Sequence, residues 1–422
     1  MKVLLVSHAF SPGRGSEPGL GWNWAWYLSR EHEIWALAHP EFRIDVESWL
    51  LRRPNPNLHI VWLKATDWDP TKGQAGVAWH YLRWLKKAEE VGRALHAEHN
   101  FDLVHHVSLN TISAPVGWWK LGIPFVWGPV GGAQACPPEL LGLFGEARWL
   151  EWARALRLRA LRHYPPFRAC VTKSAAVLAS NHETVRFLQS AGARRVPLFW
   201  DSGVVDEVLP ERPAPRTLSP EVRILWASRF LKRKALPLAL EAVARLQSTV
   251  PLKLVIAGGG HEADRWKAMA ASLRLGDRVE FLGELGPDGM RQQFRMADIF
   301  LFTSVRDSCA SVVLEAMTYA LPVVTLDIHG VGAYMPQGAG IKVSAGSRSV
   351  TVRALASALD TLAADPELRN TMGMEGWHYA ATQLWSRRAE QMSALYRGLV
   401  STHGRGEVAD IGGHGAIAGA AT

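Results

Sequence analysis

The sequence predicts an α/β protein with two doubly wound parallel sheets, one in each half of the chain, and three observations lead to this expectation. The chain has 422 residues, enough for two ordinary domains. Short apolar runs alternate with segments of helical periodicity in both halves, as in parallel sheets that helices cover on both faces. A stretch with four prolines, residues 209–220, lies between the halves and suits neither a helix nor a central strand.

The first half opens with a buried strand at residues 3–8, and helix-like and strand-like segments follow it. They are expected at residues 22–28, 34–38, 58–63, 79–96, 102–106 and 124–126. The alternation restarts after the prolines. The segments expected there are residues 223–227, 236–246, 252–257, 265–273, 279–282, 289–296, 299–302, 312–320 and 322–325. Each half is therefore expected to form its own doubly wound unit.

These patterns set the predicted domain bounds. The first domain is expected at residues 1–203 and the second at 204–384, with the linker near residues 203–220. A helix at residues 385–400 is expected to pack back toward the first domain. Residues 401–422 are rich in glycine and alanine and have no periodic apolar face, so a disordered tail is expected there.

Charge and cysteine content narrow the class of protein. The 47 Lys+Arg against 39 Asp+Glu give a net charge of +8, which suits an anionic partner such as a nucleotide or a membrane surface. The sequence contains no recognised nucleic-acid-binding module, so no nucleic-acid partner is expected. The amino-terminal apolar run is too short for a signal peptide or a membrane span. The cysteines Cys136, Cys170 and Cys309 are odd in number and lack metal-ligand spacing, so a cytoplasmic protein is expected.

The most informative stretch is residues 303–324, where a strand ends, a loop of small residues follows, and a helix begins near Ala310. Unpaired amides at a helix start suit an anion. Asp307 and Glu315 stand eight residues apart, which places one carboxylate in the loop and the other about two turns inside the helix. The residues alone allow a competing interpretation, in which Asp307 caps the helix and Glu315 is a solvated helix residue.

This block resembles the E-x7-E signature of retaining glycosyltransferase family 4, the glycosyl transferases group 1, with Asp in the first position. The resemblance implies the GT-B fold, in which two Rossmann-like domains face each other across a cleft. It implies that Asp307 binds hydroxyls of a donor sugar and that Glu315 binds the ribose. The residues that it assigns to the pyrophosphate are Ser308, Cys309, Ala310 and Ser311.

A basic loop in the same half supports the resemblance. Residues 224–242 read as a strand, a basic loop and a helix, and they are similar to the family block G-R-x-x-x-x-K-G. The resemblance implies that Arg229 and Lys234 neutralise the diphosphate, although Ser228 and Ala235 stand where the family has glycines. An ordinary basic loop between a strand and a helix is the alternative.

Glycine-rich turns follow strands in both halves and allow a close backbone approach to a ligand. In the second half, Gly258 and Gly259 follow a strand, and the family resemblance places the loop around Leu285 by the nucleobase. In the first half, Gly15 and Ser16 lie in the turn after the first strand, and the resemblance implies contact with the donor phosphates. A plain strand-to-helix turn is the alternative there.

Two neighbouring histidines end a strand in the first half, where family members often carry an active-site histidine. His105 and His106 point to opposite faces of a strand, so at most one is expected to face the cleft. We assign a catalytic role to His106 and an acceptor-side role to His105. Gly131 and Gly132, which follow the next strand, are assigned to an acceptor loop or to a simple turn.

No metal site is predicted. Asp67-Trp68-Asp69 spells D-x-D, but it follows a strand, lacks a third ligand and adjoins Pro70, so it is interpreted as a turn. The sixteen histidines show no H-E-x-x-H or similar spacing. No cofactor is expected beyond a nucleotide diphosphate sugar as co-substrate.

Residues 147–162 predict an interfacial helix, because apolar residues form one stripe along it and arginines occupy much of the remaining surface. The stripe consists of Trp149, Trp152, Ala153, Leu156 and Ala160. A peripheral membrane contact is expected through Trp149, Trp152, Arg154 and Arg157. The alternative is that the tryptophans pack against the sheet and the arginines are solvated.

The resemblance implies a metal-independent hexosyltransferase that moves a sugar, with retention, from a nucleotide diphosphate sugar to a hydroxyl. A glycan or lipid-linked saccharide is the expected acceptor, in polysaccharide or glycoconjugate biosynthesis, with the enzyme in the cytoplasm or at the inner face of the cytoplasmic membrane. The alternatives are a sugar-nucleotide epimerase of the same fold and a non-catalytic subunit that binds the nucleotide sugar.

Overall fold

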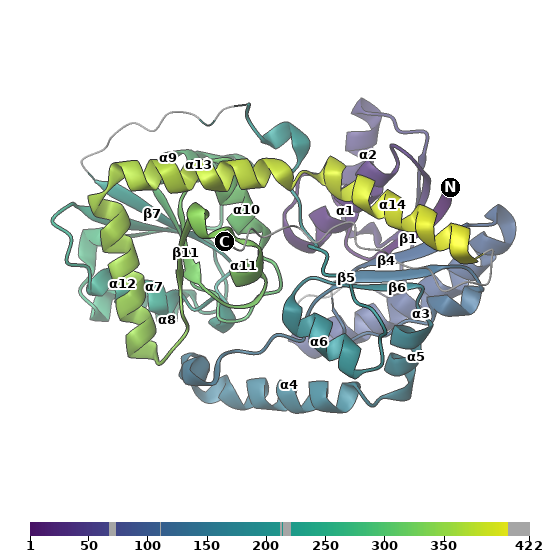
Figure 1. The fold of residues 1–422 in the computed structure, drawn as a ribbon, viewed down its shortest axis with the longest axis horizontal. Helices are drawn as coiled ribbons and strands as arrows, with labels where there is room; N and C mark the ends of the chain where they lie inside the picture. The colour runs from purple at the N-terminus through teal and green to yellow at the C-terminus, as the bar shows by residue number, and fades with distance from the viewer. Residues whose placement is uncertain (67–72, 110, 212, 214–220, 404–422) are drawn as a thin grey trace. The chain divides into compact units, whose positions relative to one another are not determined.

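The computed structural model describes residues 1–66, 73–109, 111–211, 213 and 221–403, and these form two compact units (Figure 1). Unit 1 comprises Met1–Ala133, Leu158–Ser202 and the segment from Trp385 onward. Unit 2 comprises Gln134–Arg157 and Gly203–Leu384.

Unit 1 is built on a six-stranded sheet whose paired strands are parallel, in the order β3-β2-β1-β4-β5-β6. The strands are β1 (Lys2–Ser7), β2 (Glu33–Ala38), β3 (Leu58–Trp62), β4 (Leu103–Ser108), β5 (Phe125–Val130) and β6 (Ala176–Ala179). The helices are α1 (Ser16–Leu28), α2 (Arg43–Arg52), α3 (Gly73–His99), α5 (Pro165–Lys173), α6 (His182–Ser190) and α14 (Trp385–His403), with α4 (Arg148–Leu161) crossing from unit 2. Buried apolar runs such as that of β1 form the central strands because both faces of the sheet are covered.

The two faces of this sheet carry different helices. His105 and His106 are neighbours on β4, so their side chains leave the sheet on opposite faces. His105 contacts Tyr396 of α14, and α14 in turn lies beside α1 (Figure 1). His106 contacts Tyr81 of α3. Helices α1 and α14 therefore cover one face of the sheet, and α3 covers the other.

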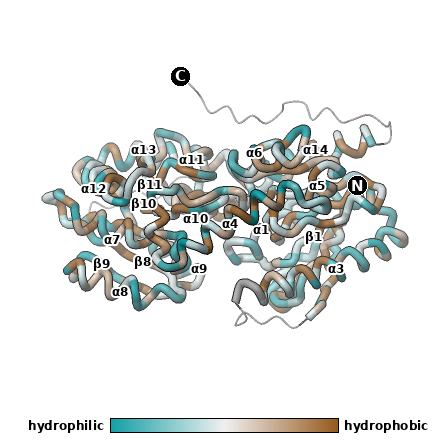
Figure 2. Tube along the Cα trace, turned by 90° about the horizontal axis from the view of Figure 1, so that it is seen from below, coloured by the Kyte–Doolittle hydropathy of each residue, from teal (hydrophilic) through white to brown (hydrophobic). Residues whose placement is uncertain are grey.

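Unit 2 repeats this architecture with the strand order β12-β11-β10-β7-β8-β9. Its strands are β7 (Val222–Ala227), β8 (Leu252–Ala257), β9 (Val279–Gly283), β10 (Ile299–Phe302), β11 (Val323–Leu326) and β12 (Gly340–Val343). Its helices are α7 (Leu236–Ala244), α8 (Ala263–Ser272), α9 (Pro287–Met296), α10 (Ser311–Thr318), α11 (His329–Tyr334), α12 (Arg348–Ala364) and α13 (Pro366–Thr382). Helix α7 packs against α8 and α12, and α10 packs against α13. Hydrophobic and hydrophilic residues alternate along the helices, as expected where one face of a helix is buried (Figure 2).

Both sheets thus have the Rossmann strand order, in which the first and fourth strands lie side by side. These central pairs are β1 and β4 in unit 1, and β7 and β10 in unit 2. The chain leaves the two strands of each pair toward opposite sides, and ligands of such sheets bind at this switch point, outside the carboxyl ends of the strands.

The units differ from the predicted domains in one segment. Residues 134–157 were assigned to the first domain, but they belong to unit 2. The 3-10 turns at Pro138–Ala147 bury Leu140, Leu143 and Phe144 in the core of the second sheet. The segment belongs to unit 2 because its apolar side chains are buried there. Its position in the sequence does not indicate this contact. Helix α14 belongs to unit 1, where Trp385 packs edge-on against Trp24.

Candidate functional site

The switch point of unit 2 is formed by the loops that follow β7 and β10. The first loop contains Arg229 and a 3-10 turn at Lys232–Lys234, and the second contains Asp307. Ser304 links the two loops, because its Oγ donates to the Arg233 carbonyl at 3.1 Å and lies 3.3 Å from Asp307 Oδ2. The two sequence blocks that resemble the family are therefore brought together in one place.

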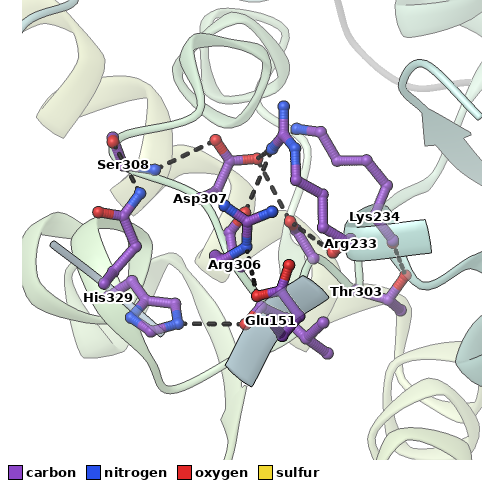
Figure 3. A network of polar contacts seen from close by, with 11 residues as sticks. Glu151, Arg233, Lys234, Thr303, Arg306, Asp307, Ser308 and His329 are labelled. Carbon is purple, nitrogen blue, oxygen red and sulfur yellow. Dashed lines mark hydrogen bonds and ion pairs between the residues drawn. The ribbon is translucent and has the colours of Figure 1, made fainter. Parts of the chain in front are cut away.

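Asp307 is held by two cations from the first loop (Figure 3). Lys234 Nζ forms a short hydrogen bond and ion pair with Asp307 Oδ2, and Arg233 Nη1 lies 3.4 Å from the same oxygen. Burial alone would raise the pKa of Asp307, but the charges of Lys234 and Arg233 outweigh burial and lower this pKa to about 2. Burial lowers the pKa of Lys234, and the Asp307 charge opposes that shift. Asp307 is therefore a carboxylate at neutral pH.

Arg233 is a site residue that the sequence reasoning missed. Besides its ion pair with Asp307, its Nη1 donates to the carbonyl of Arg306 at 3.2 Å and so fixes the loop after β10. Arg306 in turn pairs with Glu151 of α4 at 3.0 Å (Figure 3). The basic run 232–234 was the available signal, but the family pattern assigns only its last residue.

The backbone of both loops bends through left-handed conformations immediately before a helix. Ala235 has φ 50° and caps α7, and Ala310 has φ 59° and caps α10. A left-handed residue with a Cβ costs about 1 kcal/mol, which explains why the family pattern has glycine where this chain has Ala235. Neither cap residue gives its helix a side-chain hydrogen bond. The amino terminus of α10 therefore suits an anionic ligand.

Helix α11 packs against the backbone of the residues between Asp307 and Glu315. Gly330 lies against Ser308 so closely that a Cβ at position 330 would meet the Ser308 carbonyl oxygen at 1.8 Å. Tyr334 Oη donates to the Ala310 carbonyl at 3.1 Å. On the other side, Gln134 Nε2 donates to Ser308 Oγ at 2.9 Å. Cys309 is buried, so within the predicted pyrophosphate loop its backbone is the part suited to a ligand.

Glu315 is exposed on α10, one turn beyond Ser311. The residue as a whole is exposed, but burial of its carboxyl group raises the pKa of Glu315. The ribose contact predicted for Glu315 stays a prediction. Asp307 is instead engaged by Lys234 and Arg233. The direct sugar contact predicted for Asp307 stays a prediction.

The glycine turn after β8 packs closely against the backbone of the loop after β7. Gly258 has φ 137°, and a Cβ there would meet the Ser228 carbonyl oxygen at 1.9 Å. A Cβ at Gly259 would touch the side chain of Glu284 in the loop after β9, whose next residue, Leu285, is half-buried. Gly258 is therefore required where the loop after β7 and the turn after β8 meet.

In unit 1, both histidines of β4 are buried with both ring nitrogens engaged. His105 bonds to Tyr396 Oη through Nδ1 and to the Gly128 carbonyl through Nε2, the latter at 2.5 Å. Trp118 Nε1 donates to His106 Nδ1 at 3.2 Å, and His106 Nε2 lies 3.0 Å from Tyr81 Oη. Burial lowers the pKa of His105 to about 4 and that of His106 to about 3, so both rings are neutral at pH 7. This geometry favours packing over the catalytic and acceptor roles predicted for them, which stay predictions.

The remaining predicted residues of unit 1 lie in loops at its switch point. Gly15 and Ser16 are exposed at the start of α1, where Ser16 has φ 60°. Gly131 is buried, and its carbonyl accepts from Ile112 N at 3.0 Å, whereas Gly132 has φ 110° in the turn after β5. The ligand contacts predicted for these four residues stay predictions. The D-x-D stretch at Asp67-Trp68-Asp69 lies outside the described residues.

Helix α4 exposes an aromatic stripe instead of packing it against a sheet. Trp149 is 63% exposed, Trp152 is 70% exposed and Leu156 is 51% exposed. Arg157 is also exposed, but Arg154 is not part of this face, because it is half-buried and donates to the Gln134 carbonyl at 2.8 Å. The predicted set is corrected by removing Arg154. None of the described helices combines the length with the hydropathy that a membrane span requires.

Comparisons with known proteins agree with the fold and identify a family domain in the second half of the chain. Residues 211–377 match the family model of glycosyl transferases group 1. The chain therefore carries a domain of this family, and the domain contains both loops of the switch point. The D-inositol 3-phosphate glycosyltransferase of Corynebacterium glutamicum (strain R) is 30% identical over 186 residues, which are 42% of this chain and 44% of that protein. The match thus spans less than half the length of this relative.

Solved structures extend the likeness to nearly the whole chain. Sucrose-phosphate synthase from Thermosynechococcus elongatus matches with a TM-score of 0.68 at 18% identity, covering 95% of this chain and 99% of that one. Anabaena Alr3699/HepE in complex with UDP and glucose matches with a TM-score of 0.62 at 17% identity, covering 94% and 99%. At these identities the likeness shows the fold alone, which is GT-B.

Proposed function

We propose that this chain is a retaining, metal-independent hexosyltransferase that moves a sugar from a nucleotide diphosphate sugar to a hydroxyl of a glycan or a lipid-linked saccharide. The observation that carries the proposal is the cation cluster of Arg233 and Lys234 around Asp307 at the switch point of unit 2. A diphosphate is the ligand that such cations and an uncapped helix start bind together. The UDP complex of the Anabaena structure and the glycosyltransferase name of the Corynebacterium relative support the same class of donor.

The proposed chemistry uses the charge of this cluster. When the bond between the sugar C1 and the phosphate oxygen breaks, its electron pair moves to the leaving diphosphate, and Arg229, Lys234 and the start of α10 stabilise that charge. The acceptor oxygen forms the new bond to C1 on the same face, and its proton passes to an oxygen of the leaving phosphate.

The proposed acceptor side includes a membrane contact through α4. Trp149, Trp152 and Arg157 combine exposed indole rings with a positive charge, which suits the headgroup region of an anionic bilayer. The proposed location is the cytoplasm, at the inner face of the membrane, with a role in polysaccharide or glycoconjugate synthesis. A vesicle-flotation assay checks the contact. The double variant Trp149→Ala/Trp152→Ala is expected to lose binding to anionic vesicles, and Ile44→Ala/Leu51→Ala, which changes exposed apolar residues of α2, is expected to keep it.

The experiment that tests the transfer is a screen of the full chain with UDP-, GDP-, ADP- and dTDP-sugars, with and without membrane lipid extract. We expect one nucleotide class to raise the melting temperature and to yield product only in the presence of an acceptor. An altered sugar nucleotide formed without any acceptor would instead indicate an epimerase. Stabilisation without turnover under any condition would indicate a non-catalytic subunit, and no response to any nucleotide would contradict the donor site.

A further inference from the structure

Three buried histidines meet in unit 1 outside the residues considered so far. His8 follows β1, His39 follows β2, and His80 lies on α3. Because β1 and β2 pair in parallel, their carboxyl ends lie side by side, and His39 N donates to the His8 carbonyl at 3.0 Å. The exposed fractions of the three residues are 5%, 5% and 3%. No sequence spacing connects positions 8, 39 and 80, so only the fold brings them together.

The ring nitrogens are close to the spacing that a metal ion requires. One nitrogen from each ring lies within 4.8 Å of the others. His8 Nε2 and His80 Nε2 are 3.2 Å apart and share a hydrogen bond, which a bound ion would replace. Zinc–nitrogen bonds of about 2.0–2.1 Å in a tetrahedron place two ligand atoms about 3.3 Å apart. One pair therefore already has the required separation, and the third ring needs a shift of about 1.5 Å at most.

One nitrogen of the cluster is buried without a hydrogen-bond partner. His39 Nδ1 accepts from Glu41 N at 3.3 Å, but within the described part of the chain His39 Nε2 has no partner. A buried polar atom without a partner is unfavourable, because it has lost its hydrogen bond to water. The protein surroundings thus leave one ring of the cluster unsatisfied.

The rings are also in a suitable chemical state. His80 Nδ1 lies 2.6 Å from Thr66 Oγ1, and when this hydroxyl accepts, the lone pair of His80 is on Nε2. An imidazole binds a transition metal through its unprotonated nitrogen.

We propose that His8, His39 and His80 form a binding site for a divalent transition-metal ion that takes no part in the metal-independent transfer proposed for unit 2, with Zn²⁺ as the first candidate. Imidazole nitrogens without carboxylates favour zinc-like ions over Mg²⁺ or Ca²⁺. Three protein ligands leave a fourth position for water or for an oxygen of a bound molecule. His39 gives up its long contact with Glu41 N on binding, because a ring that ligates through Nε2 carries its proton on Nδ1.

The test uses the full chain without a histidine tag, stripped of metal and dialysed against micromolar Zn²⁺. We expect about one Zn²⁺ per chain by plasma mass spectrometry. With Co²⁺ in its place, we expect the intense visible bands of a four-coordinate histidine site. His39→Gln and His80→Gln are expected to lose the bound ion. Thr66→Val, which keeps all three ligands, is expected to weaken binding by about 10-fold to 100-fold.

A matched control separates metal binding from the loss of any buried histidine. His32 is also buried in unit 1, with Nε2 2.9 Å from Ser393 Oγ and Nδ1 unpartnered among the described residues, but it lies outside the cluster. His32→Gln is expected to keep the metal and the Co²⁺ spectrum. Equal Zn²⁺ content in wild type, His39→Gln and His80→Gln would overturn the proposal, as would equal loss in His32→Gln. If the glutamine variants fail to fold, an unchanged affinity in Thr66→Val together with a six-coordinate Co²⁺ spectrum of the wild type would overturn it.

Discussion

The two units have sheets of the same topology, but their switch points have opposite chemistry. In unit 2 the loops after β7 and β10 gather Arg233, Lys234 and Asp307 into an ionic cluster. In unit 1 the corresponding strand end on β4 carries His105 and His106, which are neutral, buried and hydrogen-bonded. The same fold therefore supplies a cluster of charged side chains in one unit and a packed aromatic interior in the other. The side chains at the strand ends, and not the topology, decide which it is.

The largest expected effect concerns Lys234. Lys234→Ala removes a cation from the place where the leaving diphosphate gains charge, so kcat is expected to fall by about 10²–10³-fold. Steady-state transfer assays with the nucleotide sugar found in the screen check this. Lys253→Ala is the matched control, because Lys253 is a strand residue of the same unit paired with Glu280 at 3.0 Å. If Lys234→Ala kept the kcat of the wild type, the charged cluster of unit 2 would have no role in the transfer step.

The next effect is on donor affinity. Glu315→Gln keeps the size of the exposed side chain but removes its charge, and a lost charge-assisted hydrogen bond to a ribose hydroxyl is worth about 1.5–3 kcal/mol. Affinity for the nucleoside diphosphate is therefore expected to fall by about 10-fold to 100-fold, with little change in the melting temperature. Calorimetric titration measures this. Equal affinity in both proteins would place the ribose elsewhere.

A substitution beside the buried histidines of unit 1 is expected to lower the stability of the protein and to leave kcat unchanged. Tyr396→Phe removes the partner of the buried His105 Nδ1, which costs about 1–3 kcal/mol of unfolding free energy. Denaturant unfolding and the transfer assay are measured on the same samples, with Tyr164→Phe at an exposed position as the control. A drop in kcat without loss of stability would instead support the acceptor-side role predicted for His105.

The smallest expected effect is on the pH dependence of stability. The pKa of Asp307 is about 2 in the folded chain, below the value near 3.9 of an unfolded chain, so the unfolded state takes up the proton first as pH falls. Its contribution is complete above about pH 5 and is lost toward pH 2. Between pH 4.5 and pH 3, wild type is expected to lose about 1 kcal/mol more than Asp307→Asn. Urea unfolding at the two pH values measures the difference, and parallel losses would contradict the ion pair.

The sequence predicted the parallel sheets well, because their strands are continuous apolar runs. The strand expected at residues 299–302 coincides with β10, and the helix expected near Ala310 begins at Ser311. The block pattern also located Lys234 and Asp307. It did not reveal their ion pair, because that contact depends on the pairing of β7 with β10, which brings together the loops after the two strands.

Other features depend on contacts between distant parts of the chain. Residues 134–157 join unit 2 through Leu140 and Phe144, and no local period indicates this. The engagement of His106 by Trp118 and Tyr81 likewise follows from packing, whereas the sequence shows only a histidine at a strand end. The cluster of His8, His39 and His80 has no linear motif, because each residue follows or belongs to a different element.

The central claim is that a nucleoside diphosphate binds at the switch point of unit 2. Hydrogen–deuterium exchange of the full chain, with and without a saturating nucleoside diphosphate, tests it most directly, starting with UDP. Slower exchange is expected in peptides that cover residues 229–235 and 307–315, and Lys234→Ala is expected to abolish it. Saturated binding that leaves these peptides unchanged and protects only peptides of unit 1 would contradict the claim.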